Sequence, residues 1–504
     1  MRIIVLVLPC LGCSFHTDKT QSVDEVGNAR GAANRMQLKL EHVLLKAQDA
    51  RSKLQLLRLV AMLLMDHPTS AAFIPSYPVL SSPAKGRSLK GSSPAVWMAA
   101  VLETRRKSPL TLRYRHNEKK LDRVLRRVCS HKHKWLGGAV AADGSIYGIP
   151  SHAESVIKIV PQTGSVSLLP RSSFLSCEPF KWLRGVVVPE DEGAIYGIPA
   201  AAGTVLRISP TDGKVSTVGS FPGAPWSWHG AQLAPDGMIY AIPSCAEQVL
   251  KVNPITKEVS MIGPKMEGRT KFYGGIVGDD GCVYGIPCRA DGVLKIDPKT
   301  QEVSKLGNLD WGFVESWHGG AKSPINGNIY GFPANADSVL CIIPKTGEVK
   351  KLRPDDTSAM QGKYKWLGGT VSRDGNIYCV PSDATKVLKI EPATNRVTTF
   401  GNVQGGIGNK WQGGVLGPPG DDKIYCIPSD ADTVLVIDPT NDDALSYLGE
   451  GQIPKGIKDK WQGGFLVGDT IYAIPENADT LLKLHTPTQK IELVPLQDVL
   501  HFDE

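Results

Sequence analysis

A repeated segment organises most of this chain and restricts what it can fold into. The copy at residues 366–401 reads Trp-Leu-Gly-Gly-Thr-Val, then Asp-Gly-Asn-Ile-Tyr-Cys-Val-Pro, then Val-Leu-Lys-Ile-Glu-Pro. An aromatic residue opens each of the eight copies, at Trp135, Trp182, Trp228, Phe272, Trp317, Trp366, Trp411 and Trp461. The proline that closes the Ile-Tyr segment recurs every 44 to 49 residues, at Pro150, Pro199, Pro243, Pro287, Pro333, Pro381, Pro428 and Pro475. A period of this length, held over eight copies, predicts a repeat architecture.

Each copy contains four segments that are typical of short strands. The first, Trp-x-Gly-Gly-x-Val, ends at an Asp-Gly turn such as Asp374-Gly375, where glycine accepts a positive φ. The second, Ile-Tyr-Gly-Ile-Pro, is apolar at almost every position and should be covered on both faces. The third alternates more and stops at a proline, and the fourth follows the pattern Val-Ser-Lys-Leu-Gly. Four strands per unit, arranged radially, predict an all-β fold, an eight-bladed β-propeller.

The repeat resembles those of known propeller families over roughly residues 128–497. Its Asp-Gly-x-Ile-Tyr and Val-Leu-Lys-Ile-Asp-Pro-x-Thr segments are similar to repeats of NHL, streptogramin lyase-like and gluconolactonase-like propellers, within the broad WD40/YVTN-like group. Trp-x-Gly-Gly with Ile-Tyr-Gly-Ile-Pro resembles a repeat of uncharacterised algal and protist proteins. The resemblance implies the fold; it does not select an activity, because propellers include enzymes, lectins and scaffolds.

Charge separates the repeats from what precedes them. Residues 1–130 contain 22 Lys and Arg against 9 Asp and Glu, whereas the remainder is net acidic. The basic character therefore belongs to the N-terminal region, and we expect no nucleic-acid partner for the propeller. We predict a partly helical leader at 1–66, a basic Ser- and Pro-containing linker at 67–127, the propeller at 128–497 and a tail at 498–504.

The leader carries two weak targeting signals. Residues 2–8 resemble the core of a short secretion signal, although no clear cleavage site follows. The order of an apolar run, Phe73 and a basic Ser-rich segment resembles the bipartite plastid presequence of algae with secondary plastids. A disordered basic linker is the simpler interpretation. We expect a soluble, cytoplasmic or plastid protein, since the chain lacks a long apolar stretch, a cysteine framework and Asn-x-Ser/Thr acceptors.

Departures from the repeat point to the candidate site. The residue after the opening aromatic is His229, Tyr273 and His318 in three successive copies. If this position faces a central channel, the three side chains form a polar patch with potential acid-base chemistry; otherwise they are core residues between blades. Arg184, which replaces the first glycine of the second copy, and Arg289 are candidates for binding an anionic group.

The recurring aromatic residues have two interpretations. Packing between blades is the simpler one, because indole and phenol rings bury large areas. The alternative is a set of sugar-stacking platforms, for which Trp228 and Trp317, next to the two histidines, are the ligand-binding candidates.

Enzyme and cofactor motifs are missing from the sequence. It has no Gly-x-Ser-x-Gly elbow, His-Glu-x-x-His, P-loop or dinucleotide fingerprint. His131 and His133 lack a third ligand nearby in the sequence, so we predict no metal and no cofactor. The leading hypothesis is a monomeric, non-catalytic propeller that binds a protein, small molecule or glycan on its channel face. A lyase or lactonase using His229, Tyr273 and His318, and a multivalent carbohydrate-binding propeller, are the alternatives.

Overall fold

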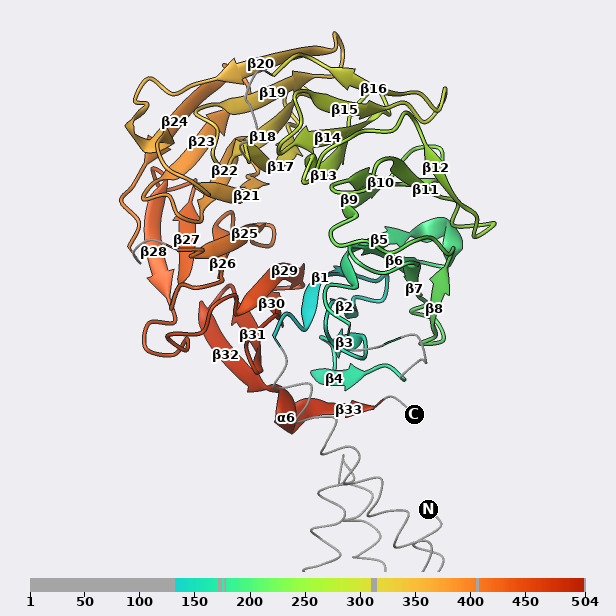
Figure 1. Ribbon diagram of the computed structural model, residues 1–504. Helices are drawn as coiled ribbons and strands as arrows, with labels where there is room; N and C mark the ends of the chain where they lie inside the picture. Colours follow the sequence, from blue (N-terminus) through green and yellow to red (C-terminus); the bar gives the residue numbers. More distant parts are fainter. Residues whose placement is uncertain (1–131, 171–174, 176–177, 310–314, 405–407, 503–504) are drawn as a thin grey trace, which may run out of the picture. The chain divides into compact units, whose positions relative to one another are not determined.

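The computed structural model describes residues 132–170, 175, 178–309, 315–404 and 408–502. The predicted leader with its helix, the whole linker and His131 lie outside them. The described strands form eight sheets of consecutive antiparallel strands, arranged around a common centre (Figure 1). This is the eight-bladed β-propeller that the repeat predicts.

The first strand of each blade lies at the centre of the ring. Neighbouring first strands contact one another around the whole circle, including the last and the first. These inner strands are β1 (Trp135–Val140), β5 (Trp182–Val188), β9 (Trp228–Leu233), β13 (Phe272–Val277), β17 (Trp317–Lys322), β21 (Trp366–Val371), β25 (Trp411–Leu416) and β29 (Trp461–Val467).

The second strands are the core of the blades. They are buried at nearly every position, as their uniformly apolar sequence predicts, because a neighbouring blade covers each face. They are β2 (Ile146–Pro150), β6 (Ala194–Pro199), β10 (Ile239–Pro243), β14 (Val283–Pro287), β18 (Ile329–Pro333), β22 (Ile377–Pro381), β26 (Ile424–Pro428) and β30 (Thr470–Pro475).

Exposure rises from the second strand to the fourth strand in seven blades, whereas the fourth strand of the first blade is buried. The third strands are mostly buried, with one or two half-buried positions in most of them, and several fourth strands carry exposed residues. The third strands are β3 (Ile157–Val160), β7 (Val205–Ile208), β11 (Val249–Val252), β15 (Val293–Ile296), β19 (Val339–Ile343), β23 (Val387–Glu391), β27 (Val434–Asp438) and β31 (Thr480–His485). The fourth strands are β4 (Ser165–Leu168), β8 (Val215–Val218), β12 (Val259–Ile262), β16 (Val303–Leu306), β20 (Glu348–Leu352), β24 (Arg396–Phe400), β28 (Ala444–Leu448) and β32 (Lys490–Pro495).

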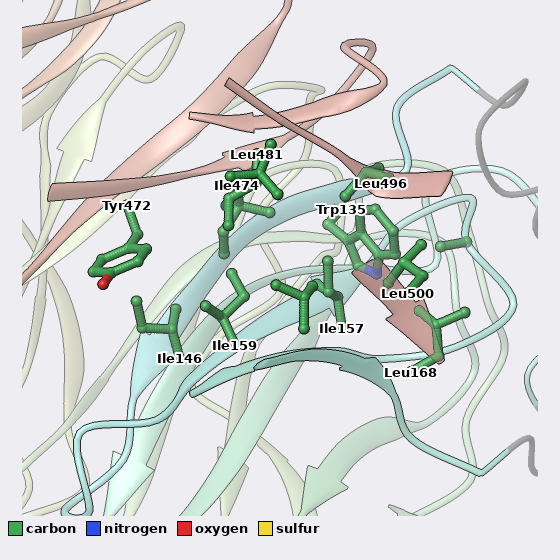
Figure 2. Packing of buried hydrophobic residues seen from close by; sticks show 13 residues of the cluster. Trp135, Ile146, Ile157, Ile159, Leu168, Tyr472, Ile474, Leu481, Leu496 and Leu500 are labelled. Atoms are coloured by element: carbon green, nitrogen blue, oxygen red, sulfur yellow. The ribbon is translucent and has the colours of Figure 1, made fainter. Parts of the chain in front are cut away.

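The repeated Trp and Tyr residues pack between blades, as the simpler interpretation predicts. Trp135 of the first blade shares a buried cluster with Tyr472 and Ile474 of the last blade (Figure 2). Each Trp that opens a blade is at most 3% exposed and donates its indole N–H to a backbone carbonyl of its own blade, as Trp135 does to Ser155 at 2.9 Å. Sugar stacking requires exposed rings, and these rings are not exposed.

The Asp-Gly turns form as predicted and also anchor the tyrosines. Gly237 has φ +78°, and the backbone N–H of Met238 donates to Asp236 Oδ1 at 3.0 Å. The other carboxylate oxygen of Asp236 accepts a hydrogen bond from the Tyr240 hydroxyl at 2.7 Å. One aspartate therefore stabilises both the turn and the buried tyrosine of the next strand.

The C-terminal residues join the last blade to the first. After β32, a single helical turn, α6 (Leu496–Val499), leads to β33 (Leu500–Phe502), which pairs in parallel with β4. Leu496 and Leu500 enter the cluster around Trp135 (Figure 2). The segment predicted as a tail thus contributes a fifth strand to the first blade. Two 3-10 turns, η2 (Pro189–Asp191) and η3 (Ser358–Met360), lie in loops, and no described helix is long and apolar enough to cross a membrane.

Candidate functional site

A β-bulge shapes the start of every inner strand. Pairing with the second strand shifts register close to the opening aromatic residue in all eight blades. The first glycine of Trp-x-Gly-Gly takes a left-handed conformation in most blades, for example φ +83° at Gly230. A Cβ atom added to Gly230 would lie 3.1 Å from Gly274 Cα of the next blade. Glycine therefore allows the inner strands to approach closely at the centre.

We call the residue between the aromatic and this glycine the variable position. Its side chains meet their neighbours from adjacent blades around the ring, as when Gln462 Nε2 donates to Gln412 Oε1 at 3.2 Å. Inner strands are mostly half-buried, in contrast to the second strands, so solvent reaches the centre. The variable positions are Leu136, Leu183, His229, Tyr273, His318, Leu367, Gln412 and Gln462.

The structure brings His229, Tyr273 and His318 together. The imidazole of His229 stacks on the ring of Tyr273, with centroids 3.4 Å apart and planes inclined by 27°. The ring of His318 follows on the other side of Tyr273 at a centroid distance of 4.1 Å. His229 is 8% exposed, whereas Tyr273 and His318 are half-buried. Three blades thus form one continuous group of polar rings beside the centre.

Both histidines are neutral near pH 7. Burial, followed by the positive charge of Arg184, lowers the pKa of His318 to about 4 and that of His229 well below its usual value. His318 Nδ1 lies 2.8 Å from the carbonyl oxygen of Leu367, so Nδ1 carries the proton and Nε2 is an acceptor. His229 Nδ1 is buried and has no hydrogen-bond partner among the described residues. Burial also raises the pKa of Tyr273, which remains a neutral phenol.

Arg184 is the charged member of this group. It occupies the first-glycine position of β5 with φ +54°, a conformation that is unfavourable for a residue with a side chain. The residue is exposed, although desolvation lowers its pKa, and its charge acts on His229, Tyr273 and His318. Arg184 is therefore open to solvent while its charge acts on the three rings. We call Arg184, His229, Tyr273 and His318 the axial cluster.

The charge of Arg184 lacks a counterion in the described part of the chain. No ion pair or hydrogen bond of its guanidinium is found there, and Tyr273 is the group that opposes the lowering of its pKa. Arg289, the other predicted arginine, lies outside the cluster and donates to Glu315 Oε1 at 2.7 Å. Glu315 nevertheless acts electrostatically on Tyr273 and His318, so a carboxylate lies near the cluster.

The predicted ligand-binding tryptophans are placed differently. Trp228 is 3% exposed and Trp317 is fully buried. Their indole nitrogens donate to the carbonyl oxygens of Gln248 at 3.0 Å and Ser338 at 2.8 Å. Both side chains therefore hold the inner strands that carry His229 and His318, and contribute packing instead of an exposed ring.

A set of buried lysines near the inner strands was not expected from the sequence. Lysine precedes the opening aromatic in six blades and is at most 5% exposed, although lysine is rarely buried completely. The Nζ of Lys365 donates to the carbonyl oxygen of Ala334 in the preceding blade at 2.9 Å, and Lys410 does the same to Ala384 at 2.9 Å. The repeated Lys-Trp or Lys-Phe pair is the sequence feature from which these buried lysines could have been predicted. The six residues are Lys134, Lys181, Lys271, Lys365, Lys410 and Lys460.

The two remaining blades carry serine instead, and they are the two with histidine at the variable position. Ser227 precedes Trp228 and Ser316 precedes Trp317, and both serines are buried. The axial histidines thus occur where the buried ammonium group is replaced by a hydroxyl.

A second group that the sequence analysis missed lies where the ring closes. His133, for which no metal site was predicted because no third ligand is near in the sequence, lies close to Asp459 and Glu476 of the last blade. More than 320 residues separate His133 from either carboxylate, so no local motif could reveal the group.

The ring of four-stranded blades and the polar cluster at its centre define an eight-bladed β-propeller with a candidate ligand site. No protein-family model and no curated protein matches the sequence. Among solved structures the chain is similar to a streptogramin B lyase, with 13% identity, a TM-score of 0.45 and coverage of 59% of this chain and 91% of that one.

Two other solved structures have comparable similarity. A virginiamycin B lyase from Staphylococcus aureus is 12% identical, with a TM-score of 0.42 and coverage of 69% and 93%. A putative 6-phosphogluconolactonase from Bacteroides uniformis is 16% identical, with a TM-score of 0.40 and coverage of 59% and 90%. The names of these matched structures include a streptogramin lyase, one of the kinds of protein that the repeat resembles.

Proposed function

We propose that this protein is a non-catalytic binding propeller whose axial cluster takes a small organic anion, such as a carboxylate or a phosphate ester. The observation that carries the proposal is Arg184: a partly desolvated guanidinium without a counterion in the described residues, placed where other blades have glycine. An anion would supply the missing charge, and a guanidinium matches carboxylate and phosphate in geometry.

The neighbouring rings complete such a site without adding charge. Neutral His229 and His318 and the Tyr273 hydroxyl offer donors and acceptors to the uncharged part of a ligand. Because these rings stack on one another, they are preorganised, and little side-chain entropy is lost when a ligand binds. The close approach of the inner strands favours a small ligand over a protein segment.

Thermal unfolding and isothermal titration calorimetry with inorganic phosphate and a set of mono- and dicarboxylates test the proposal. We expect at least one anion to raise the unfolding temperature of the wild type and to bind it, and Arg184→Gly to abolish both effects. Glu192→Gly is the matched control, because Glu192 is exposed and also has φ +54°, but lies outside the axial cluster. Equal responses of the wild type and Arg184→Gly would overturn the proposal.

Acid-base catalysis at the same cluster is a second candidate. It is favoured by the buried Nδ1 of His229, which lacks a partner, and by Glu315 acting on Tyr273 and His318. A neutral imidazole with a low pKa is a weak base, which places this reading second. Turnover of γ- or δ-lactones that the double variant His229→Ala/His318→Ala loses would establish it.

A further inference from the structure

One junction of the ring is not spanned by a loop between consecutive blades. Successive blades are joined through the loop that follows each fourth strand, whereas the last and first blades meet through side-chain contacts, backbone hydrogen bonds and β33. His133 lies two residues before β1, Asp459 lies two residues before β29, and Glu476 follows β30 directly. The three side chains meet at this junction, which we call the closure seam.

The geometry of the three side chains suits a metal ion. Each residue offers one ligand atom, and the three atoms lie within 4.8 Å of one another. His133 Nδ1 is 2.5 Å from Glu476 Oε1. Glu476 is 4% exposed, whereas His133 and Asp459 are half-buried, so the group is anchored on one side and open to solvent on the other.

The fold does not require a carboxylate at the position of Glu476. The other seven blades carry a small residue after the closing proline, and most of these are serine or alanine. A buried glutamate is costly unless a cation compensates it, and burial raises the pKa of Glu476 despite the opposing effects of His133 and the buried Lys134. The equivalent residues are Ser151, Ala200, Ser244, Cys288, Ala334, Ser382 and Ser429.

Hydrogen bonds with neighbouring residues hold the side chain of Asp459 and the backbone of His133 in place. Asn409 Nδ2 donates to Asp459 Oδ1 at 3.0 Å, and the backbone N–H of His133 donates to Asn477 Oδ1 at 2.6 Å. Partners of this kind fix ligand orientation in metal sites. His133 and Asp459 each have φ +51° and hold the same place in their blades, two residues before the opening tryptophan.

We propose that His133, Asp459 and Glu476 bind a divalent cation of the Zn²⁺ or Mn²⁺ type, which joins the last blade to the first. One imidazole nitrogen and two carboxylate oxygens favour such ions over Ca²⁺, which prefers oxygen ligands alone. On binding, the metal displaces the proton shared by His133 and Glu476, which leaves to solvent, and the two ligand atoms move apart to share the ion. This site is independent of the axial cluster.

Untagged full-length protein, stripped with a chelator and dialysed, provides the test. We expect Zn²⁺ or Mn²⁺ to bind with a stoichiometry of one in calorimetry and to raise the unfolding temperature. Glu476→Gln keeps the shape of the side chain and a hydrogen bond to His133, and it should weaken metal binding at least 10-fold. Asp459→Asn should weaken binding to the same extent, and it changes a half-buried residue instead of a buried one. Asp383→Asn, on an equivalent loop of another blade, should bind as the wild type does.

Two outcomes would overturn the proposal. The first is wild type that neither binds nor is stabilised by either metal, in which case the His133–Glu476 contact is only an ion pair. The second is undiminished binding by both Glu476→Gln and Asp459→Asn. The double variant His229→Ala/His318→Ala must retain binding, because loss there would place the metal in the axial cluster.

Discussion

The imidazole of His229 lies face to face with the phenol ring of Tyr273, at a centroid distance of 3.4 Å, although the two residues belong to different blades. This contact exists because the bulged inner strands bring equivalent positions of successive blades together at the centre. The same symmetry that builds the fold therefore gathers residues that differ between copies. A site at the centre of a propeller can arise by substitution at one position of the repeat.

Arg184→Gly should stabilise the protein while removing anion binding. Glycine occupies the equivalent position in the other seven blades, and relief of the left-handed arginine is worth about 1 kcal/mol. Urea unfolding measures the gain, with Glu192→Gly as the control for the backbone effect alone. A destabilised Arg184→Gly would mean that the guanidinium supports the fold.

Acid should destabilise the protein through the axial histidines. The folded-state pKa of His318, about 4, lies below its unfolded value of 6.5, so the unfolded chain binds more protons between these values. Stability therefore falls as the pH drops from 6.5 toward 4, by about 3 kcal/mol for His318, and levels off below.

His318→Gln tests this assignment, because glutamine occupies the same position at Gln412 and Gln462. Urea unfolding at pH 7, 5.5 and 4.5 should give a flatter profile for this variant. The exposed His485 supplies the control His485→Gln, which should keep the wild-type slope. An unchanged slope in His318→Gln would contradict the assigned cause.

The buried lysines should make stability rise between pH 8 and 10. Burial lowers the pKa of Lys365 to about 8, so the folded protein loses this proton before the unfolded chain does. Stability attributable to this lysine should therefore increase with pH over that range, by up to about 2 kcal/mol.

Lys365→Met removes the titrating group and keeps the length of the side chain. We expect a smaller rise in unfolding free energy from pH 8 to 10 than in the wild type. We also expect a loss of about 1–3 kcal/mol at pH 8, since the carbonyl oxygens of Ala334 and Gly362 both lose the hydrogen bond from the ammonium group. Lys299→Met, at an exposed turn, is the control.

The sequence predicts the fold because each repeat carries its own strand and turn signals. The turn glycines and the apolar second strand lie within one copy, so four strands per blade follow from a single copy, and the period over eight copies adds the number of blades. The variable position was also identifiable, because eight aligned copies make His229, Tyr273 and His318 stand out. The direction of these side chains depends on the β-bulge at the start of each inner strand. The sequence shows that bulge only as a Gly-Gly pair and does not reveal the left-handed conformation of the first glycine.

Contacts across the closure seam could not be predicted in this way. His133 and Glu476 are 343 residues apart and meet only after the ring has closed. For Trp228 and Trp317 the sequence suggested a contact that the structure does not contain. Their position next to a histidine suggested ligand contact, whereas their indoles turn into the blade. Adjacent residues in a strand point to opposite faces, so neighbours in sequence need not share a site.

Closure by β33 predicts that Leu500 contributes strongly to stability. Leu500 is 6% exposed and packs in the cluster of Trp135 and Leu168, where its removal leaves a cavity (Figure 2). Leu500→Ala should cost about 2–4 kcal/mol in unfolding free energy, the usual range for a buried leucine. Ile325→Ala is the control, because Ile325 is 53% exposed, and it should change stability by less than about 0.5 kcal/mol. Chemical denaturation of both variants decides between a closing strand and an attached tail: if Leu500→Ala behaves like Ile325→Ala, the ring closes through the inner strands and the lysine contacts alone.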